Sequence, residues 1–156
     1  MAMSKKLLDR YDLAILRTLE NNGRMTTIEL ADRIGLSKTP CHARIKRLET
    51  QGYIKGYAAV LNQELMGNKH VAFVQVKLKD TRAHALKAFN EAVQSVPVIE
   101  ECHMMASDFD YILKVRTTDI ATYREILGET ITALPFVAST STFVAMEIVK
   151  EHTHVF

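Results

Sequence analysis

Polar and basic groups gather on one short piece of the chain, between Ser37 and Arg47. If this stretch is helical, Cys41 and Leu48 share one side and the hydroxyl, imidazole and cationic side chains project on or near the other. Such groups donate hydrogen bonds to base edges and phosphates. We assign Thr39, His42, Ala43 and Lys46 to bases and Lys38, Arg44 and Arg47 to phosphates. The whole candidate DNA-binding set is Ser37, Lys38, Thr39, Pro40, His42, Ala43, Arg44, Lys46 and Arg47.

The flanking residues predict the helices that would hold this stretch. Ser37 is placed to cap the basic helix, and Gly52 supplies a left-handed stop. Upstream, Thr26 and Glu29 have the spacing of a capping box, and the short connection at Gly35 is typical of a helix-turn-helix. The predicted helices cover residues 9–21, 26–34 and 37–51.

The remaining candidate chemical groups predict neither catalysis nor a metal site. Cys102 and His103 are neighbours on a predicted strand, so their side chains point to opposite faces. Cys41 lies on the core stripe of its helix, and two cysteines without a Cys-x-x-Cys pair are typical of reduced thiols in a cytosolic protein. His152 and His154 lack a third ligand, which favours an ordinary chain end over a metal site.

Charge is distributed unevenly along the 156 residues. Residues 1–62 carry eleven Lys and Arg against six Asp and Glu, whereas the remainder carries nine against twelve. This asymmetry predicts a polyanion-binding head on a body with another task. The N-terminus has no apolar signal segment and the chain has no stretch long enough to cross a membrane, so we expect a cytoplasmic protein.

The body follows a different periodicity. Residues 53–61 are rich in aromatic and β-branched side chains and predict an extended segment, more strand than flexible linker. Beyond the turn at 62–69, alternation and helical spacing predict the order strand, helix, strand, strand, helix, strand. That order is typical of a ferredoxin-like sheet with two helices on one face. The other face is left open, and we expect another subunit to cover it. The expected ranges are 70–79, 82–95, 98–106, 109–117, 119–134 and 137–150.

Four separated motifs carry a more specific resemblance: the helix at 36–52, the following Tyr53–Tyr57, the run Glu100–His103, and Asp108–Tyr111. Together they resemble the Lrp/AsnC family of transcription regulators, near its leucine-responsive branch. The resemblance implies a winged helix-turn-helix domain over residues 1–52, a strand hinge over 53–69, and a ferredoxin-like, ACT-like domain over 70–156 that binds an effector and oligomerises. It also implies double-stranded DNA as partner, a small amino acid as effector, and homodimers that assemble into octamers.

In such proteins the amino acid binds beside the turn between the second and third body strands. Backbone N–H groups of a turn hold a carboxylate, and an Asp takes the ammonium. At Ser107 and Phe136 the family commonly has glycine, so both side chains would narrow or reshape the pocket. The effector-binding set that the resemblance implies is Met105, Ala106, Ser107, Asp108, Phe109, Asp110, Tyr111, Phe136, Val137, Thr140, Thr142 and Val144.

These observations lead to one principal hypothesis and two alternatives. The principal one is a sequence-specific transcription regulator of amino-acid metabolism, without cofactor, acting at the nucleoid and answering to an amino acid. If Ser107 and Phe136 close the pocket, the alternative is an architectural DNA-binding protein that takes no effector. An enzyme using Asp108 or Asp110 is the third hypothesis, and the intact basic head argues against it.

Overall fold

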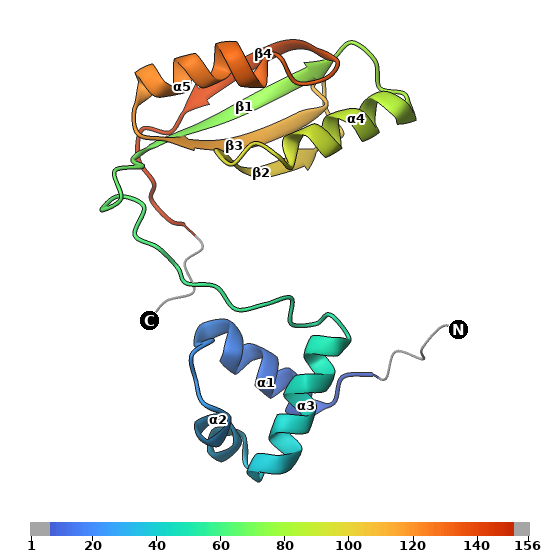
Figure 1. The fold of residues 1–156 in the computed structure, drawn as a ribbon, viewed down its shortest axis with the longest axis vertical. Helices are drawn as coiled ribbons and strands as arrows, with labels where there is room; N and C mark the ends of the chain where they lie inside the picture. The colour runs from blue at the N-terminus through green and yellow to red at the C-terminus, as the bar shows by residue number, and fades with distance from the viewer. Residues whose placement is uncertain (1–6, 152–156) are drawn as a thin grey trace. The chain divides into compact units, whose positions relative to one another are not determined.

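The computed structural model describes residues 7–151, and these form two compact units that we treat separately. One comprises the described residues up to Leu61 together with Glu151, and the other spans Asn62–Lys150 (Figure 1). The predicted histidines at 152 and 154 lie outside the described residues.

The first unit contains the three predicted helices, α1 (Arg10–Asn21), α2 (Thr27–Ile34) and α3 (Lys38–Thr50). The capping box at the start of α2 is confirmed, because Thr26 Oγ1 accepts from the N–H of Glu29 and the Glu29 carboxylate accepts from the N–H of Thr26. Gly35 ends α2 in the left-handed conformation with φ 71°, so the chain turns sharply into α3.

The apolar stripes of these helices meet in a small core. Ile15 of α1, Leu30 of α2, and Cys41 and Leu48 of α3 are all fully buried there. The stripe predicted on α3 is therefore confirmed, and the opposite surface of that helix is left to solvent.

Two local expectations for this unit were wrong. Ser37 occupies the position and backbone conformation of an N-cap, yet its side chain makes no capping hydrogen bond. Residues 53–61 form no strand. A strand needs a partner for its backbone groups, and no other segment between residues 7 and 151 pairs with this one.

The second unit is a four-stranded antiparallel sheet with helices, as predicted for a ferredoxin-like fold. The strand order is β2, β3, β1, β4, so the first strand in sequence lies between the third and fourth. The elements are β1 (His70–Leu78), α4 (Ala83–Val93), β2 (Ile99–Met104), β3 (Tyr111–Thr117), α5 (Ile120–Ile126), a π-helical turn (Leu127–Ile131) and β4 (Val137–Val144). The last strand ends six residues before the predicted limit. The ladder with β1 reaches Val144, and one further hydrogen bond runs from the N–H of Ala145 to the carbonyl of Val71.

Alternation along the strands puts one face of the sheet against both helices. Val74 and Val76 of β1 are buried with Phe89 of α4 and with Tyr123 of α5. On the other face Phe73 of β1 is 39% exposed, so the described chain leaves this face uncovered, as expected.

Candidate DNA-binding helix and effector turn

The recognition face of α3, as we define it, consists of Thr39, His42, Ala43 and Lys46, and all four side chains are exposed. They lie opposite or beside the buried stripe at Cys41 and Leu48, which fixes the helix against α1 and α2. The structure thus leaves the residues that we assigned to bases open to a partner. Lys38 and Pro40, at the start of the same helix, are exposed as well.

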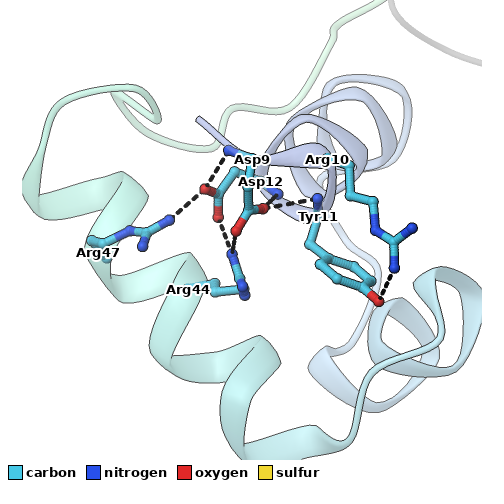
Figure 2. A network of polar contacts seen from close by, with 6 residues as sticks. All are labelled: Asp9, Arg10, Tyr11, Asp12, Arg44 and Arg47. Atoms are coloured by element: carbon cyan, nitrogen blue, oxygen red, sulfur yellow. Dashed lines mark hydrogen bonds and ion pairs between the residues drawn. The ribbon is translucent and has the colours of Figure 1, made fainter. Parts of the chain in front are cut away.

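Arg44 and Arg47 are placed differently from the residues of the recognition face. Their guanidinium groups turn toward the start of α1, as Figure 2 shows. Arg44 Nη1 lies 2.6 Å from Asp9 Oδ2 and 2.8 Å from Asp12 Oδ1, and Arg47 Nη2 lies 2.5 Å from Asp12 Oδ2. Asp12 is 1% exposed, so these contacts compensate a buried carboxylate.

This cluster of Asp9, Asp12, Arg44 and Arg47, which we call the clamp, fastens the recognition helix to α1. Asp9 also caps α1 by accepting from the N–H groups of Tyr11 and Asp12. The backbone hydrogen bond from Asp12 and the Arg44 guanidinium lower the pKa of Asp9 to about 2. The hydrogen bond to the Asp9 carboxylate, followed by the one to the Asp12 carboxylate, raises the pKa of Arg44. Asp9 and Arg44 therefore both carry their charges at neutral pH.

The clamp gives a structural role to two of the residues that we assigned to phosphates, and that phosphate assignment stays a prediction. Arg44 and Arg47 were assigned to phosphates because their charged tips were expected to reach outward from the helix. A carboxylate buried in the head requires compensating donors, and these two arginines supply them. Lys38 is exposed and forms no part of the clamp, and its assignment to phosphate is likewise a prediction.

The clamp acids are the functional residues that sequence reasoning missed. The predicted helix over residues 9–21 already placed both at its start, and their spacing, Asp-x-x-Asp, is the signal that would have predicted the capping box. Nothing in the spacing shows that Arg44 and Arg47, more than thirty residues away, turn toward them.

A second candidate site lies at one end of the sheet, where the β2–β3 turn meets the end of β1 and the start of β4. The N–H of Met105 donates to the carbonyl of Asp110, and the N–H of Asp110 donates to the carbonyl of Val76. On the other side of β1 the N–H of Lys79 donates to the carbonyl of Phe136. The turn residues and Phe136 are thus held to the same end of the sheet, as an effector site beside the turn requires.

Within the turn the two aspartates differ in their tasks. Asp110 Oδ2 accepts from the N–H of Leu78 at 2.7 Å, at the point where the register of β1 against β4 shifts. This bond satisfies a donor that the ladder leaves without a partner. Asp108 is exposed, and its one hydrogen bond within residues 7–151 is accepted from its neighbour, the Ser107 hydroxyl, at 2.8 Å. Asp108 is therefore the carboxylate of the turn that a ligand ammonium can reach.

Phe136 has an uncommon backbone. Its φ of 63° lies in the left-handed region, and it is the only residue besides glycines at 35, 52 and 67 to adopt a positive φ among those described. A Cβ in this region is unfavourable by roughly 1–2 kcal/mol. The ring packs edge to face on His84 of α4 with centroids 5.4 Å apart. Strain of this kind concentrates at ligand-binding sites.

Several of the other predicted effector residues are committed to the core instead. Tyr111 is 2% exposed with its ring centroid 4.4 Å from that of Phe89, and Val137 is 8% exposed. Thr142 Oγ1 lies 2.5 Å from the Tyr123 hydroxyl under α5. Val144 pairs with Ala72, four residues along β1 from Val76, and so lies roughly 13 Å from the turn. Tyr111, Val137 and Thr142 thus take part in core packing, whereas Val144 is 46% exposed, and the assignment of all four to the effector site stays a prediction. Of the remaining set, Phe109 is half-buried, Met105, Ala106 and Ser107 are exposed, and Thr140 pairs with Val76 near the turn.

The thiols and histidines form no reactive pair in the described residues. Cys41 is buried and Cys102 is half-buried, and burial raises the pKa of each thiol, as expected for structural cysteines. Cys102 pairs with Leu113 and packs on the core, while His103 faces the other side of β2. Over residues 7–151 no group of three metal-ligating side chains converges, and none of the helices there is long and apolar enough to cross a membrane.

Both parts of the chain that hold a candidate site match known protein families. Residues 8–55 match the profile described as winged helix-turn-helix DNA-binding, and residues 71–155 match the Lrp/AsnC ligand binding domain. A proline dehydrogenase transcriptional activator of Rhizobium radiobacter is 56% identical over 97% of this chain and 98% of its own. The leucine-responsive regulatory protein of Klebsiella pneumoniae is 46% identical over 94% and 89%.

Solved structures agree with the sequence comparisons. A transcriptional regulator from Neisseria meningitidis in complex with L-Met superimposes with a TM-score of 0.87 at 30% identity, covering 95% of this chain and 96% of its own. An AsnC family transcriptional regulator from Agrobacterium tumefaciens gives 0.86 at 33% identity, covering 92% and 94%. With a DNA-binding helix held in the first unit and an effector fold in the second, the chain belongs to the Lrp/AsnC family of amino-acid-responsive transcription regulators.

Proposed function

We propose that this protein activates a gene of amino-acid catabolism in response to the amino acid that the gene product consumes, with proline as the first effector to test. Two relatives, 56% and 52% identical, are named as transcriptional activators of proline dehydrogenase. A regulator of an enzyme that consumes proline is useful only when proline is present. This role places the protein on chromosomal DNA in the cytoplasm, with no catalytic step and no cofactor of its own.

The observation that carries the proposal is that α3 has two separate surfaces. Arg44 and Arg47 hold the helix against α1, and the exposed recognition face on the same helix is free to contact bases. Lys46 donates well to guanine acceptors, and the Ala43 methyl group fits against a thymine methyl group. The N-terminal residues of a recognition helix reach the major groove, which agrees with the early position of Thr39.

Gel shifts with an operator fragment and with random DNA of equal length test this assignment. We expect Lys46→Ala and His42→Ala to weaken operator binding by about 1–3 kcal/mol each and to leave random DNA almost unchanged. Lys38→Ala, the matched phosphate control, should weaken both fragments alike. Equal losses on both fragments for Lys46→Ala and His42→Ala would refute the base-contact assignment.

For the effector we propose a site at the end of the sheet, bounded by Ala106, Ser107, Asp108, Phe109 and Phe136. Turn N–H groups bind the ligand carboxylate and Asp108 binds the ammonium, because Asp110 is occupied by Leu78. The Phe136 ring then lies against an apolar side chain. A flat, compact side chain such as that of proline suits a site already narrowed by a ring.

A thermal-shift screen against the twenty amino acids tests the effector. A ligand of the folded state at one hundred times its Kd stabilises the protein by about 2.7 kcal/mol. We expect a shift with proline in the wild type and a smaller one in Asp108→Asn, with Asp108→Glu as the charge-keeping control. A shift with leucine or methionine but not proline would overturn the choice of effector. No shift with any of them would favour the architectural alternative, for which the strained Phe136 ring at the site is the specific observation.

We further propose that two copies pair through the open face of the sheet. Phe73 and Phe143 are directly opposite one another on β1 and β4, and they are 39% and 53% exposed. Their neighbours on β3 and β2 form ion pairs, among them Lys114 with Glu100 at 3.1 Å. An apolar pair beside satisfied charges is typical of an interface that also exists as a free surface. Sedimentation of Phe143→Glu should show monomers where the wild type forms dimers. We expect four wild-type dimers to assemble further into an octamer.

A further inference from the structure

The DNA-binding unit contains a groove that neither the recognition face nor the effector site uses. It is about 830 Å³ in volume and lies beside the end of α1 and the α1–α2 connection. One wall is apolar and comes from Ala58, Ala59 and Val60, which follow α3. The remaining lining residues are Arg17, Thr18, Asn21, Asn22, Gly23, Arg24 and Arg33.

The charge of this groove is of one sign. Arg17, Arg24 and Arg33 contribute three guanidinium groups, and no Asp or Glu is among the lining residues. All three arginines are exposed, and none of them forms an ion pair with any residue in the described part of the chain. In the same unit the clamp arginines are both paired with carboxylates. A cleft lined by one sign of charge attracts a counter-ion strongly.

The types of donor indicate which anion fits. A guanidinium group offers a planar fork of N–H donors that matches phosphate in a bidentate manner, and amide side chains also donate to phosphate oxygens. The backbone at the groove is held in place, because Asn22 Oδ1 accepts from the N–H of Arg24 at 3.1 Å and Asn21 Nδ2 donates to the carbonyl of Arg17 at 2.8 Å. The donors are therefore presented on an ordered turn.

The position of the groove indicates where the phosphates come from. A smaller cavity of about 240 Å³ adjoins it, since both are lined by Gly23, and that cavity is also lined by His42 and Lys46 of the recognition face. A path thus leads from the recognition helix past Gly23 to the three arginines. Glu49 also lines the smaller cavity, where its carboxylate accepts from the Tyr57 hydroxyl at 3.0 Å. A duplex seated on α3 extends beyond its recognised bases, and its backbone can follow this path.

We propose that the groove of Arg17, Arg24 and Arg33 binds phosphodiester groups of DNA flanking the recognised site. It rests on the proposed function, because the recognition helix must first seat the duplex. The groove then adds affinity that does not depend on base sequence and makes binding stronger on long DNA than on a minimal site. The same guanidinium groups would bind a free polyphosphate, and the test separates these two sources.

The sharpest variants change charge without changing the arginines. Ala59 is exposed in the apolar wall, so Ala59→Glu introduces a carboxylate that competes for the guanidinium groups, and Ala59→Gln has nearly the same shape without the charge. Arg24→Ala/Arg33→Ala removes two of the three cations directly. Lys55→Ala is the control, because Lys55 is exposed in the same unit and lies outside the groove.

Each protein is titrated with a duplex that carries flanks of roughly two helical turns on each side, and with a trimmed site, between 50 and 200 mM salt. Each lost phosphate contact lowers the slope of log K against log salt by about 0.9. On the long duplex, raising the salt from 50 to 200 mM weakens the binding of every protein. The double arginine variant should lose roughly 12-fold less affinity per protomer than the wild type over this range. Ala59→Glu should behave similarly, while Ala59→Gln and Lys55→Ala should match the wild type, and all should agree on the trimmed site.

Calorimetric titration with inorganic tripolyphosphate, without DNA, provides the second arm. If tripolyphosphate binding is lost in Ala59→Glu but the salt slopes do not change, the groove binds a free phosphate compound and the DNA source is overturned. If neither slope nor tripolyphosphate binding differs between Ala59→Glu and Ala59→Gln, the phosphate site itself is overturned. A wild type without any preferred DNA site would contradict the proposed function, yet the tripolyphosphate arm would still report on the groove.

Discussion

Asp12→Asn is the substitution that tests the clamp most directly. The Asp12 carboxylate is almost completely buried and faces two guanidinium groups, with one oxygen 2.8 Å from Arg44 and the other 2.5 Å from Arg47. Asparagine has nearly the same shape but carries no charge. Its amide nitrogen would present N–H donors to a guanidinium group that can only donate, so one contact becomes repulsive.

The expected cost follows from the burial of the partners. Removing one partner of a fully buried ion pair costs about 3–5 kcal/mol, because the other charge stays behind uncompensated. Arg44 and Arg47 have side chains that are 24% and 27% exposed, so water takes over part of the solvation. We therefore expect a loss of about 2–3 kcal/mol in the free energy of unfolding of the head. For a unit of this size that is a fall in Tm of roughly 10–20 °C.

Amide hydrogen exchange on the full chain locates the effect. Protection at Ile15 and Leu48 should fall, while protection at Val74 in the sheet should not change, because the two core clusters are separate. Asp9→Asn is the matched control: the Asp9 side chain is 47% exposed, so the head should lose much less. Changes below about 0.5 kcal/mol for Asp12→Asn, or equal effects of the two substitutions, would refute the clamp as the fastening of α3.

Three further predictions concern the body. Phe136→Gly removes the Cβ that strains the backbone at φ 63°, whereas Phe136→Ala keeps it and removes the ring, so chemical denaturation should show the glycine variant more stable than the alanine variant by about 1 kcal/mol. The Arg82 hydrogen bond lowers the pKa of Asp80 to about 2, so its contribution to stability is complete above pH 4 and is lost as pH falls from about 4 to 2. In an NMR titration, Arg82→Ala should raise that pKa toward 3.8; a value still near 2 would contradict the cause given. Tyr123→Phe removes the hydroxyl that lies 2.5 Å from Thr142 and should lower the Tm of the body by several degrees, corresponding to about 1 kcal/mol, and Thr142→Val in the same background should cost little more.

The effector site shows where prediction from sequence stops. The β2–β3 turn was located because polar and small residues interrupt two strand patterns, and that signal is local. Which residues surround the turn depends on register, since a side chain on β4 comes near it only at the end that pairs with Val76. Thr140 meets that condition and Val144 does not. The separate tasks of Asp108 and Asp110 depend on the shifted register at Leu78, which no pattern of residue types reveals.

By itself the sequence determined the three helices of the head and the order of helices and strands in the body, but not the conformation of residues 53–61. Helical spacing, the Thr26 and Glu29 capping box and the change to strand alternation are properties of neighbouring residues, so the helix-turn-helix and the antiparallel sheet followed from them. Only the tertiary structure decided which arginine side chains are exposed to solvent and which are paired with carboxylates. A buried Asp12 must be compensated, and Arg44 and Arg47 lie against it for that reason, whereas Arg17, Arg24 and Arg33 are exposed. All five residues are alike in a sequence, and only their distance from a desolvated carboxylate separates structural cations from those available to a ligand.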